Sequence, residues 1–328
     1  MGYFLMPSLA SYSTSLNLLF FYMTWSTLVL SQPPLKVEVV GTLAIRSLFF
    51  LVPSLLFLVF DSIIPSVAVS FKTQGTEALP TRTGGKKSRN GGKPQWYQVI
   101  GLSLFNICLG VAIQAGVELL FTEALGFRSA LKVTTTLPMP WSIGKDVARS
   151  LVLREFLQYY THRYILHPKS PNFLSKLHKS YFHSITAPYS FAAHYDHPLA
   201  YFLWRFLPTY LPSILFRAHL LTYLLLLSII TIEETLAMSG YATVPGIILG
   251  GIARRQDLHS EGQGKGNFAP YGLLDWLHGS GIGPDVVDDM KDEAEKHNVK
   301  ERGGKALENA KESGARAWNG RKKSAKKT

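Results

Sequence analysis

Long apolar stretches constrain this chain more than any other feature of its sequence. The first charged residue is Lys36. A helix needs about 20 mostly apolar residues to cross a hydrocarbon core of roughly 30 Å. Four stretches reach that length, at residues 13–31, 43–71, 94–117 and 147–166. Pro53 and Pro65 are expected to bend the second of them. The sequence therefore predicts an all-α integral membrane protein, a bundle of about four transmembrane helices.

Charge is concentrated near the C-terminus. Lys and Arg number 34 and Asp and Glu number 22, and 21 of these charged residues lie within residues 281–328. A segment this polar has little apolar surface to bury. Residues 285–328 are therefore expected to form a polar, disordered tail.

A basic loop sets the expected topology. Residues 72–93 contain six basic residues and one acid, with several glycines. Short basic loops stay on the cytosolic side of a membrane. The loop lacks the aromatic residues that a nucleic-acid surface interleaves with basic ones, so no nucleic-acid partner is expected. With two crossings before the loop, the N-terminus is also expected in the cytosol. Residues 199–253 are apolar again. The histidines before and after this stretch can meet only if they lie on the same side of the membrane, so the stretch must cross an even number of times, zero or two.

Histidines gather in one polar window between the apolar segments. Residues 162–197 contain six of the ten histidines, and one more follows at position 259. Imidazole is a common ligand of iron, copper and zinc, and a histidine-rich, carboxylate-poor set suits iron or zinc. The candidate ligands are His162, His167, His178, His183, His194, His197 and His259, with Gln256 as a possible weak ligand.

The spacing of these histidines restricts how they can meet. His162 and His167 are five residues apart, which is about 140° on an ideal α-helix. They share one metal site only if the helix ends or bulges between them. The same gap separates His178 from His183. Four neighbouring polar residues are candidates to hold the ring N–H groups: Arg163, Lys179, Asp196 and Asp257.

The sequence lacks the motifs of zinc peptidases, serine hydrolases and phosphate-binding loops. The segment HRYILH at 162–167 has no glutamate general base, unlike the HEXXH motif of zinc peptidases. The chain contains no Gly-x-Ser-x-Gly elbow and no phosphate-binding Gly-x-x-x-x-Gly-Lys loop. Arg205 and Arg217, at the borders of apolar runs, are expected to extend toward lipid headgroups.

Four segments taken together resemble the fatty acid hydroxylase superfamily, which includes sterol desaturases and sterol 4-methyl oxidases. They are HRYILH (162–167), LHKSYFHSITAP (177–188), HYDHP (194–198) and DLHSEGQGKGNFAPYGLLDWLHGS (257–280). Members of that superfamily look like membrane-embedded diiron enzymes with a cytosolic histidine-rich cap. The resemblance covers about residues 95–280 and implies a fatty acid hydroxylase-like catalytic domain at residues 94–284. Hydropathy and charge assign N-terminal membrane helices and the basic cytosolic loop to residues 1–93.

The resemblance also implies cofactors and partners. They are iron, as two Fe, and O₂, with electrons supplied by NAD(P)H through cytochrome b5 and its reductase. The implied substrate is a membrane lipid of sterol or fatty-acyl type, and the implied location is the endoplasmic reticulum membrane, with the histidine cap and both termini cytosolic.

The chain departs from the superfamily pattern at ligand positions. Tyr181 and Phe182 fall where the second segment usually begins a histidine pair. Two of three histidines are absent from the third segment, where Gln256 and Ser260 occupy the positions of the missing two and His259 remains. Three hypotheses follow: an iron-dependent lipid hydroxylase or desaturase, a non-catalytic lipid-binding or scaffolding member, or a membrane protein that binds one zinc.

Overall fold

The computed structural model describes residues 6–82, 94–244, 246–284, 287–288 and 291, and the side chains from residue 16 onward. Half of the basic loop, residues 83–93, and nearly all of the tail predicted at 285–328 lie outside the described residues. By its internal contacts the chain divides into two units at Gly283, and the second unit lies almost wholly outside the described residues. The description below concerns the first unit.

The described part of the chain is helical and contains no strand. The longer helices are α1 (Met6–Ser31), α2 (Pro34–Arg46), α3 (Val52–Ile63), α5 (Trp96–Leu119), α6 (Pro140–Tyr160), α10 (Leu220–Ala237) and α11 (Ile247–Glu261). The shorter ones are α4 (Pro65–Phe71), α7 (Phe173–Tyr181), α8 (Pro198–Tyr201), α9 (Leu207–Leu215) and α12 (Leu273–Leu277). Four π-helical turns are η1 (Ser47–Leu51), η4 (Leu120–Ala124), η5 (Thr161–Leu166) and η8 (Phe202–Phe206). Four 3₁₀ turns are η2 (Gly75–Ala78), η3 (Pro80–Arg82), η6 (Phe182–Ser184) and η7 (Ser190–His194). The all-α prediction is confirmed.

Three helical segments are long and apolar enough to cross a membrane: Pro34–Ile63, Trp96–Ala124 and Leu220–Ala237. A shorter apolar helix covers Leu16–Ser31. The second predicted stretch thus begins earlier and ends earlier than expected. It begins at Pro34, because the fixed φ of proline suits the first position of a helix. It ends before Pro65, which starts the separate helix α4.

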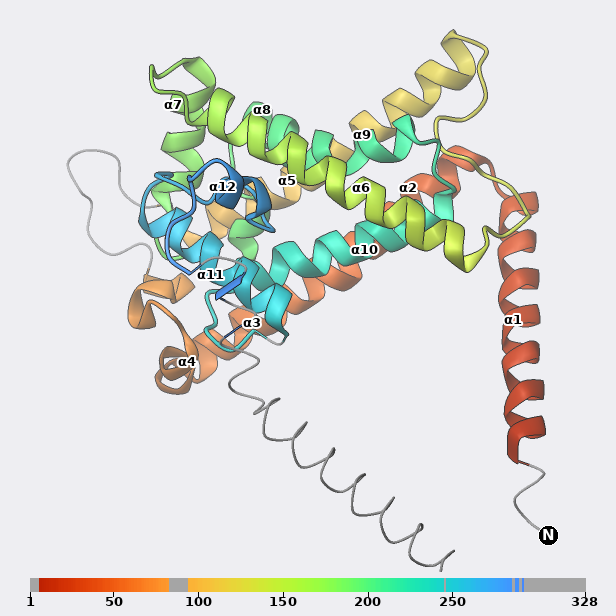
Figure 1. The fold of residues 1–328 in the computed structure, drawn as a ribbon, viewed down its shortest axis with the longest axis horizontal. Helices are drawn as coiled ribbons and strands as arrows, with labels where there is room; N and C mark the ends of the chain where they lie inside the picture. Colours follow the sequence, from red (N-terminus) through yellow and green to blue (C-terminus); the bar gives the residue numbers. More distant parts are fainter. Residues whose placement is uncertain (1–5, 83–93, 245, 285–286, 289–290, 292–328) are drawn as a thin grey trace, which may run out of the picture. The chain divides into compact units, whose positions relative to one another are not determined.

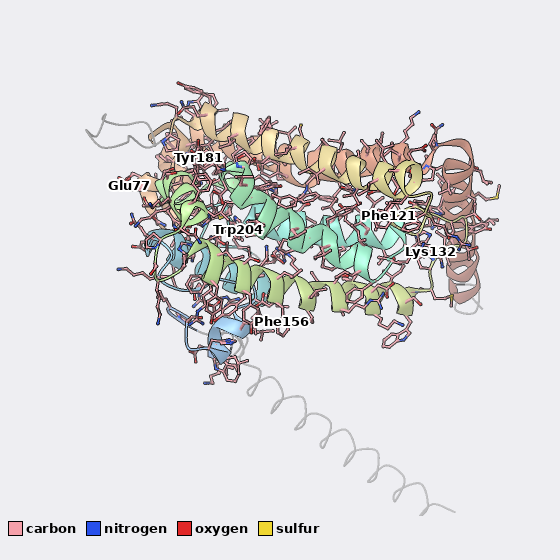
Figure 2. All side chains as sticks on the ribbon, turned by 90° about the horizontal axis from the view of Figure 1, so that it is seen from above. Glu77, Phe121, Lys132, Phe156, Tyr181 and Trp204 are labelled. Atoms are coloured by element: carbon pink, nitrogen blue, oxygen red, sulfur yellow. The ribbon has the colours of Figure 1, made fainter. Side chains whose placement is uncertain are left out.

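Helices α2, α3 and α10 run along one oblique direction, from lower left to upper right, and α6 crosses them (Figure 1). Helix α2 contacts α5 and α10, and α6 contacts α9 and α10. Helix α1 runs across that direction in both views (Figures 1 and 2). Segment 147–166 falls on α6 and η5, and is not among the three segments apolar enough to cross. Arg154 and Glu155 are its buried charged residues.

Side chains of neighbouring helices satisfy the carbonyl groups that two prolines leave free. A proline has no N–H to donate to the carbonyl four residues earlier. Pro53 thus frees the carbonyl of Phe49, which accepts a bond of 3.1 Å from the Thr235 hydroxyl on α10. Pro208 frees the carbonyl of Trp204, which accepts a bond of 3.0 Å from the Gln158 amide on α6. Because lipid offers no hydrogen bonds, such interhelical partners allow prolines inside membrane helices.

A buried network of charged side chains joins four helical elements. Arg154 lies 2.9 Å from Glu233, Arg46 lies 3.2 Å from Glu234, and Arg205 lies 3.3 Å from Glu234. All five side chains are buried. Burying charge is costly unless it is paired, and pairing explains why Arg205 lies inside the bundle. The prediction that Arg205 extends to lipid headgroups is therefore wrong. Arg217 is exposed.

Candidate metal centre

Five histidines converge at one end of the bundle. Each offers one ring nitrogen, and these five nitrogens all lie within 4.8 Å of one another. The five are His162, His167, His178, His183 and His259. Figure 2 shows Tyr181 and Trp204 toward this end and Phe121 and Lys132 toward the other. Four of the five imidazoles are buried, and that of His167 is half-buried.

A π-helical turn brings the first pair together. Turn η5 ends with a hydrogen bond of 2.9 Å from the His167 amide to the His162 carbonyl, five residues earlier. A π turn closes between residues five apart, so these two residues lie on one face, which an α-helix prevents. Their ring centroids are 4.9 Å apart. The sequence-based condition of a bulge between His162 and His167 is met.

The second pair meets because its helix ends between the two histidines. Helix α7 starts at Asn172, whose side chain accepts a bond of 2.7 Å from the Ser175 amide. It carries His178 and ends at Tyr181, and the 3₁₀ turn η6 then carries His183. The tighter turn redirects the chain, so that His183 Nε2 lies 3.1 Å from His167 Nε2.

His259 reaches the cluster from helix α11, and the loop after α11 passes close to it. Gly264 in this loop has φ +80°, and a Cβ atom there would overlap the ring of His167. A glycine is needed because it alone has neither the side-chain atom nor the penalty of positive φ. The loop then supplies the Gly266 carbonyl, which lies 2.6 Å from His259 Nδ1.

Hydrogen bonds to Nδ1 fix which nitrogen of three rings faces the cluster. His162 Nδ1 lies 2.9 Å from the Phe268 carbonyl, and His178 Nδ1 lies 2.6 Å from the Asp196 carboxylate. Carbonyl and carboxylate oxygens only accept, so both Nδ1 atoms carry hydrogen, and in the neutral tautomer both Nε2 atoms then carry lone pairs. Those lone pairs face each other at 3.3 Å. Two bare lone pairs at this distance repel unless a cation lies between them, so the donor set fits a metal ion.

The histidines are held in the neutral form that binds metals. Burial, reinforced by the other histidines, lowers the pKa of His167 to about 2. Burial also lowers the pKa of His259 to about 4 and the pKa of His183 far below its ordinary value of 6.5. His259 Nε2 and His183 Nδ1 are buried and have no hydrogen-bond partner. A metal ion would supply the missing partner for the Nε2 atom of His259.

The structure does not place two of the candidate histidines in the cluster. His194 is fully buried near the charged network, with Arg46 3.4 Å from its Nε2 and the Tyr201 hydroxyl 3.1 Å from its Nδ1. His197 is half-buried, and its Nδ1 accepts from the Leu199 amide at the start of α8. Gln256 lies on α11 one turn before His259, and its Nε2 is buried without a partner.

Of the four candidates for holding ring N–H groups, Asp196 bonds to a histidine of the cluster. Its carboxylate also accepts a hydrogen bond of 2.9 Å from the indole N–H of Trp204. The ring of Trp204 stacks on that of His162, with centroids 4.4 Å apart. Arg163 bonds to Tyr159 and Ser280 instead. Sequence reasoning missed Trp204, because an aromatic residue in an apolar run gives no sign of this role. It also missed the carbonyls of Gly266 and Phe268, since a backbone acceptor leaves no mark on residue type.

An all-α chain with membrane-length helices and a buried all-histidine cluster defines a class: helical proteins with membrane-length helices and a histidine cluster able to hold a metal ion. Residues 147–280 match the sequence profile of the fatty acid hydroxylase family, and all five histidines of the cluster lie in this range. This match and the curated relatives support membership of the fatty acid hydroxylase superfamily.

Two curated relatives agree with the profile. Fatty acid hydroxylase ahd1 of Mycosarcoma maydis is 29% identical over 184 residues, which cover 55% of this chain and 44% of that protein. Fatty acid hydroxylase domain-containing protein 2 of Homo sapiens is 28% identical over 137 residues, which cover 41% of this chain and 38% of that protein. The chain thus spans less than half the length of either relative. No solved structure matches the chain significantly.

Proposed function

We propose that this protein is an iron-dependent, O₂-using lipid hydroxylase or desaturase that acts on a sterol or fatty-acyl-type lipid in the membrane. The observation that carries the proposal is the convergence of five imidazoles, whose donor nitrogens lie within 4.8 Å of one another, inside a segment that matches the fatty acid hydroxylase profile. Iron bound there would supply the redox chemistry for attacking an unactivated C–H bond, which no side chain can supply.

The residues of the chain have three tasks in this proposal. The five imidazoles bind the ion, and the acceptors at Phe268, Gly266 and Asp196 hold three of them in one tautomer and orientation. The buried rings of Phe182 and Trp204 pack against the imidazoles and exclude water. Exclusion of water limits side reactions at an oxidising centre.

We also propose the endoplasmic reticulum membrane as the location, with the centre on the cytosolic side, where cytochrome b5 and its reductase would deliver electrons from NAD(P)H. One contact supports a shared side for the basic loop and the histidines. The side-chain amide of Gln74 donates a hydrogen bond of 3.1 Å to the carbonyl of Thr186, three residues after His183. The start of the basic segment thus contacts the histidine segment.

The proposal is tested by metal content together with product. Full-length protein would be purified in detergent, reconstituted with Fe(II) without oxygen, and analysed for bound metal beside His162→Ala and His259→Ala. Cells that express each form would be compared by lipid mass spectrometry for a product carrying one added oxygen or lacking two hydrogens. We expect iron and product in the wild type and neither in the variants. Purified wild type that holds no iron after reconstitution would overturn the proposal.

A further inference from the structure

We propose that the cluster holds one metal ion rather than the two that the resemblance to diiron enzymes implies. The inference rests on the metal-binding part of the proposed function and concerns the number of ions. Three independent observations carry it: the distances among the donor nitrogens, the rings that surround them, and the charge of the donor set.

The distances among the nitrogens match one coordination sphere. For a metal–nitrogen bond of roughly 2.0–2.1 Å, two ligands on one ion lie about 3.0 Å apart at a right angle, about 3.4 Å at the tetrahedral angle and about 4.2 Å when opposite. Two pairs in the cluster are 3.1 and 3.3 Å apart. All other pairs lie within 4.8 Å.

If the same nitrogens bound two ions, the distances between them would be longer. Ions in two-metal sites are about 3.5–4 Å apart, so ligands at the outer ends of the pair are roughly 7–8 Å apart. No pair among the five nitrogens approaches that separation, since every one lies within 4.8 Å. The measured distances therefore leave no donor for the far side of a second ion.

Aromatic rings fill the flanks where a second ion would sit. Phe182 is buried and contacts three imidazoles of the cluster, with centroids 5.1, 5.2 and 6.2 Å away. Phe268, also buried, contacts three imidazoles at 5.6, 5.8 and 5.9 Å. Trp204 closes a third side with contacts at 4.4 and 5.6 Å. Phe182 stands where the superfamily pattern begins a histidine pair, so an apolar ring replaces a ligand there.

The charge of the donor set also limits the number of ions. Five imidazoles bring no negative charge, and among the described residues no carboxylate joins the five nitrogens. The Asp196 carboxylate is already engaged by His178 and Trp204. Two divalent ions would place four positive charges in a buried site, where repulsion is weakly screened. One ion halves that charge and removes the repulsion between ions.

The experiment counts ions per chain without relying on activity. Full-length protein in detergent would be titrated anaerobically with Fe(II) and, separately, with Zn(II), and bound metal would be quantified by mass spectrometry after desalting. His183→Gln tests whether the ligands act as one set. In a one-ion site, the loss of any ligand lowers the affinity for all of the metal that the chain binds. His197→Asn is the matched control, since it removes an imidazole outside the cluster and keeps an acceptor at the start of α8.

We expect one iron per chain in the wild type and in His197→Asn, and at least tenfold weaker binding of that single ion in His183→Gln. One tightly bound zinc, with iron excluded, would support the count and overturn the proposed iron chemistry. Two irons per chain, with one retained at wild-type affinity in His183→Gln, would overturn the count and leave the proposed function standing. No metal at all would overturn both.

Discussion

Asp196 is the residue whose replacement tests the architecture of the centre most directly. Its buried carboxylate contacts three donors: His178 Nδ1 at 2.6 Å, Trp204 Nε1 at 2.9 Å and the His197 amide at 2.7 Å. The isosteric change Asp196→Asn keeps the volume and removes the charge. One end of the new amide carries only N–H groups, so at least one of the three donors then faces another donor.

The size of the effect follows from two estimates that agree. Hydrogen bonds to charged groups contribute roughly 1.5–3 kcal/mol and neutral ones about 0.5–1.5 kcal/mol, so two weakened bonds cost about 2 kcal/mol. Removing an acceptor that orients a metal-binding histidine lowers metal affinity about 10–100-fold. That range corresponds to about 1.4–2.7 kcal/mol.

The assay is competition for Fe(II) or Zn(II) against a coloured chelator, with the wild type and Asp196→Asn side by side. We expect the metal dissociation constant of the variant to rise 10–100-fold with the number of ions unchanged. Asp61→Asn is the control: it removes a buried carboxylate bonded to Lys72 and Tyr241, at a place that contacts no histidine of the cluster. Equal metal affinity in the wild type, Asp196→Asn and Asp61→Asn would refute the role assigned to Asp196.

Three further predictions concern the loop, the helix packing and pH. Gly264→Ala adds a Cβ against the ring of His167 at positive φ, so we expect metal affinity to fall at least tenfold, and unchanged affinity would contradict the close approach. Thr235→Val removes the partner of a proline-freed carbonyl and should lower the free energy of unfolding in detergent by about 1–3 kcal/mol. Thr222→Val on the same helix should cost little, because its buried hydroxyl has no partner, and equal losses in both variants would refute the argument. Because the pKa values of His259 and His167 are lowered to about 4 and about 2, the unfolded chain takes up protons below about pH 6.5 that the native chain does not. The metal-free protein should therefore lose stability from pH 7 to pH 5, and a flat profile of melting temperature would contradict this.

The class of fold could be predicted from sequence, because membrane length and lack of charge act residue by residue along the chain. The first and last residues of the helices were harder to predict from the sequence. The span at Pro34–Ile63 is set by prolines at both ends, and the sequence pattern extends it to residue 71. Arg205 was misjudged because its burial depends on Glu234, which lies 29 residues away and whose position no local pattern reveals.

The site could be predicted in part. Residue type and density identified all five histidines of the cluster, since imidazole has few other reasons to accumulate. The same reasoning included His194 and His197, because composition cannot distinguish a ligand from a histidine that bonds Arg46 or caps a helix. Asp196 was among the candidates on the strength of its charge and neighbourhood. The walls formed by Phe182 and Phe268 follow only from three-dimensional packing.

The π-helical turn between His162 and His167 has a consequence for how such sites vary among proteins. Two side chains five residues apart coincide on a π turn, and two that are four apart nearly coincide on an α-helix. Deleting one residue from HRYILH and letting the turn relax to ordinary pitch would therefore keep both imidazoles in register with the ion. Spacings of four and five are then interchangeable solutions of one geometry, and a search that insists on one spacing overlooks chains that place their histidines with the other.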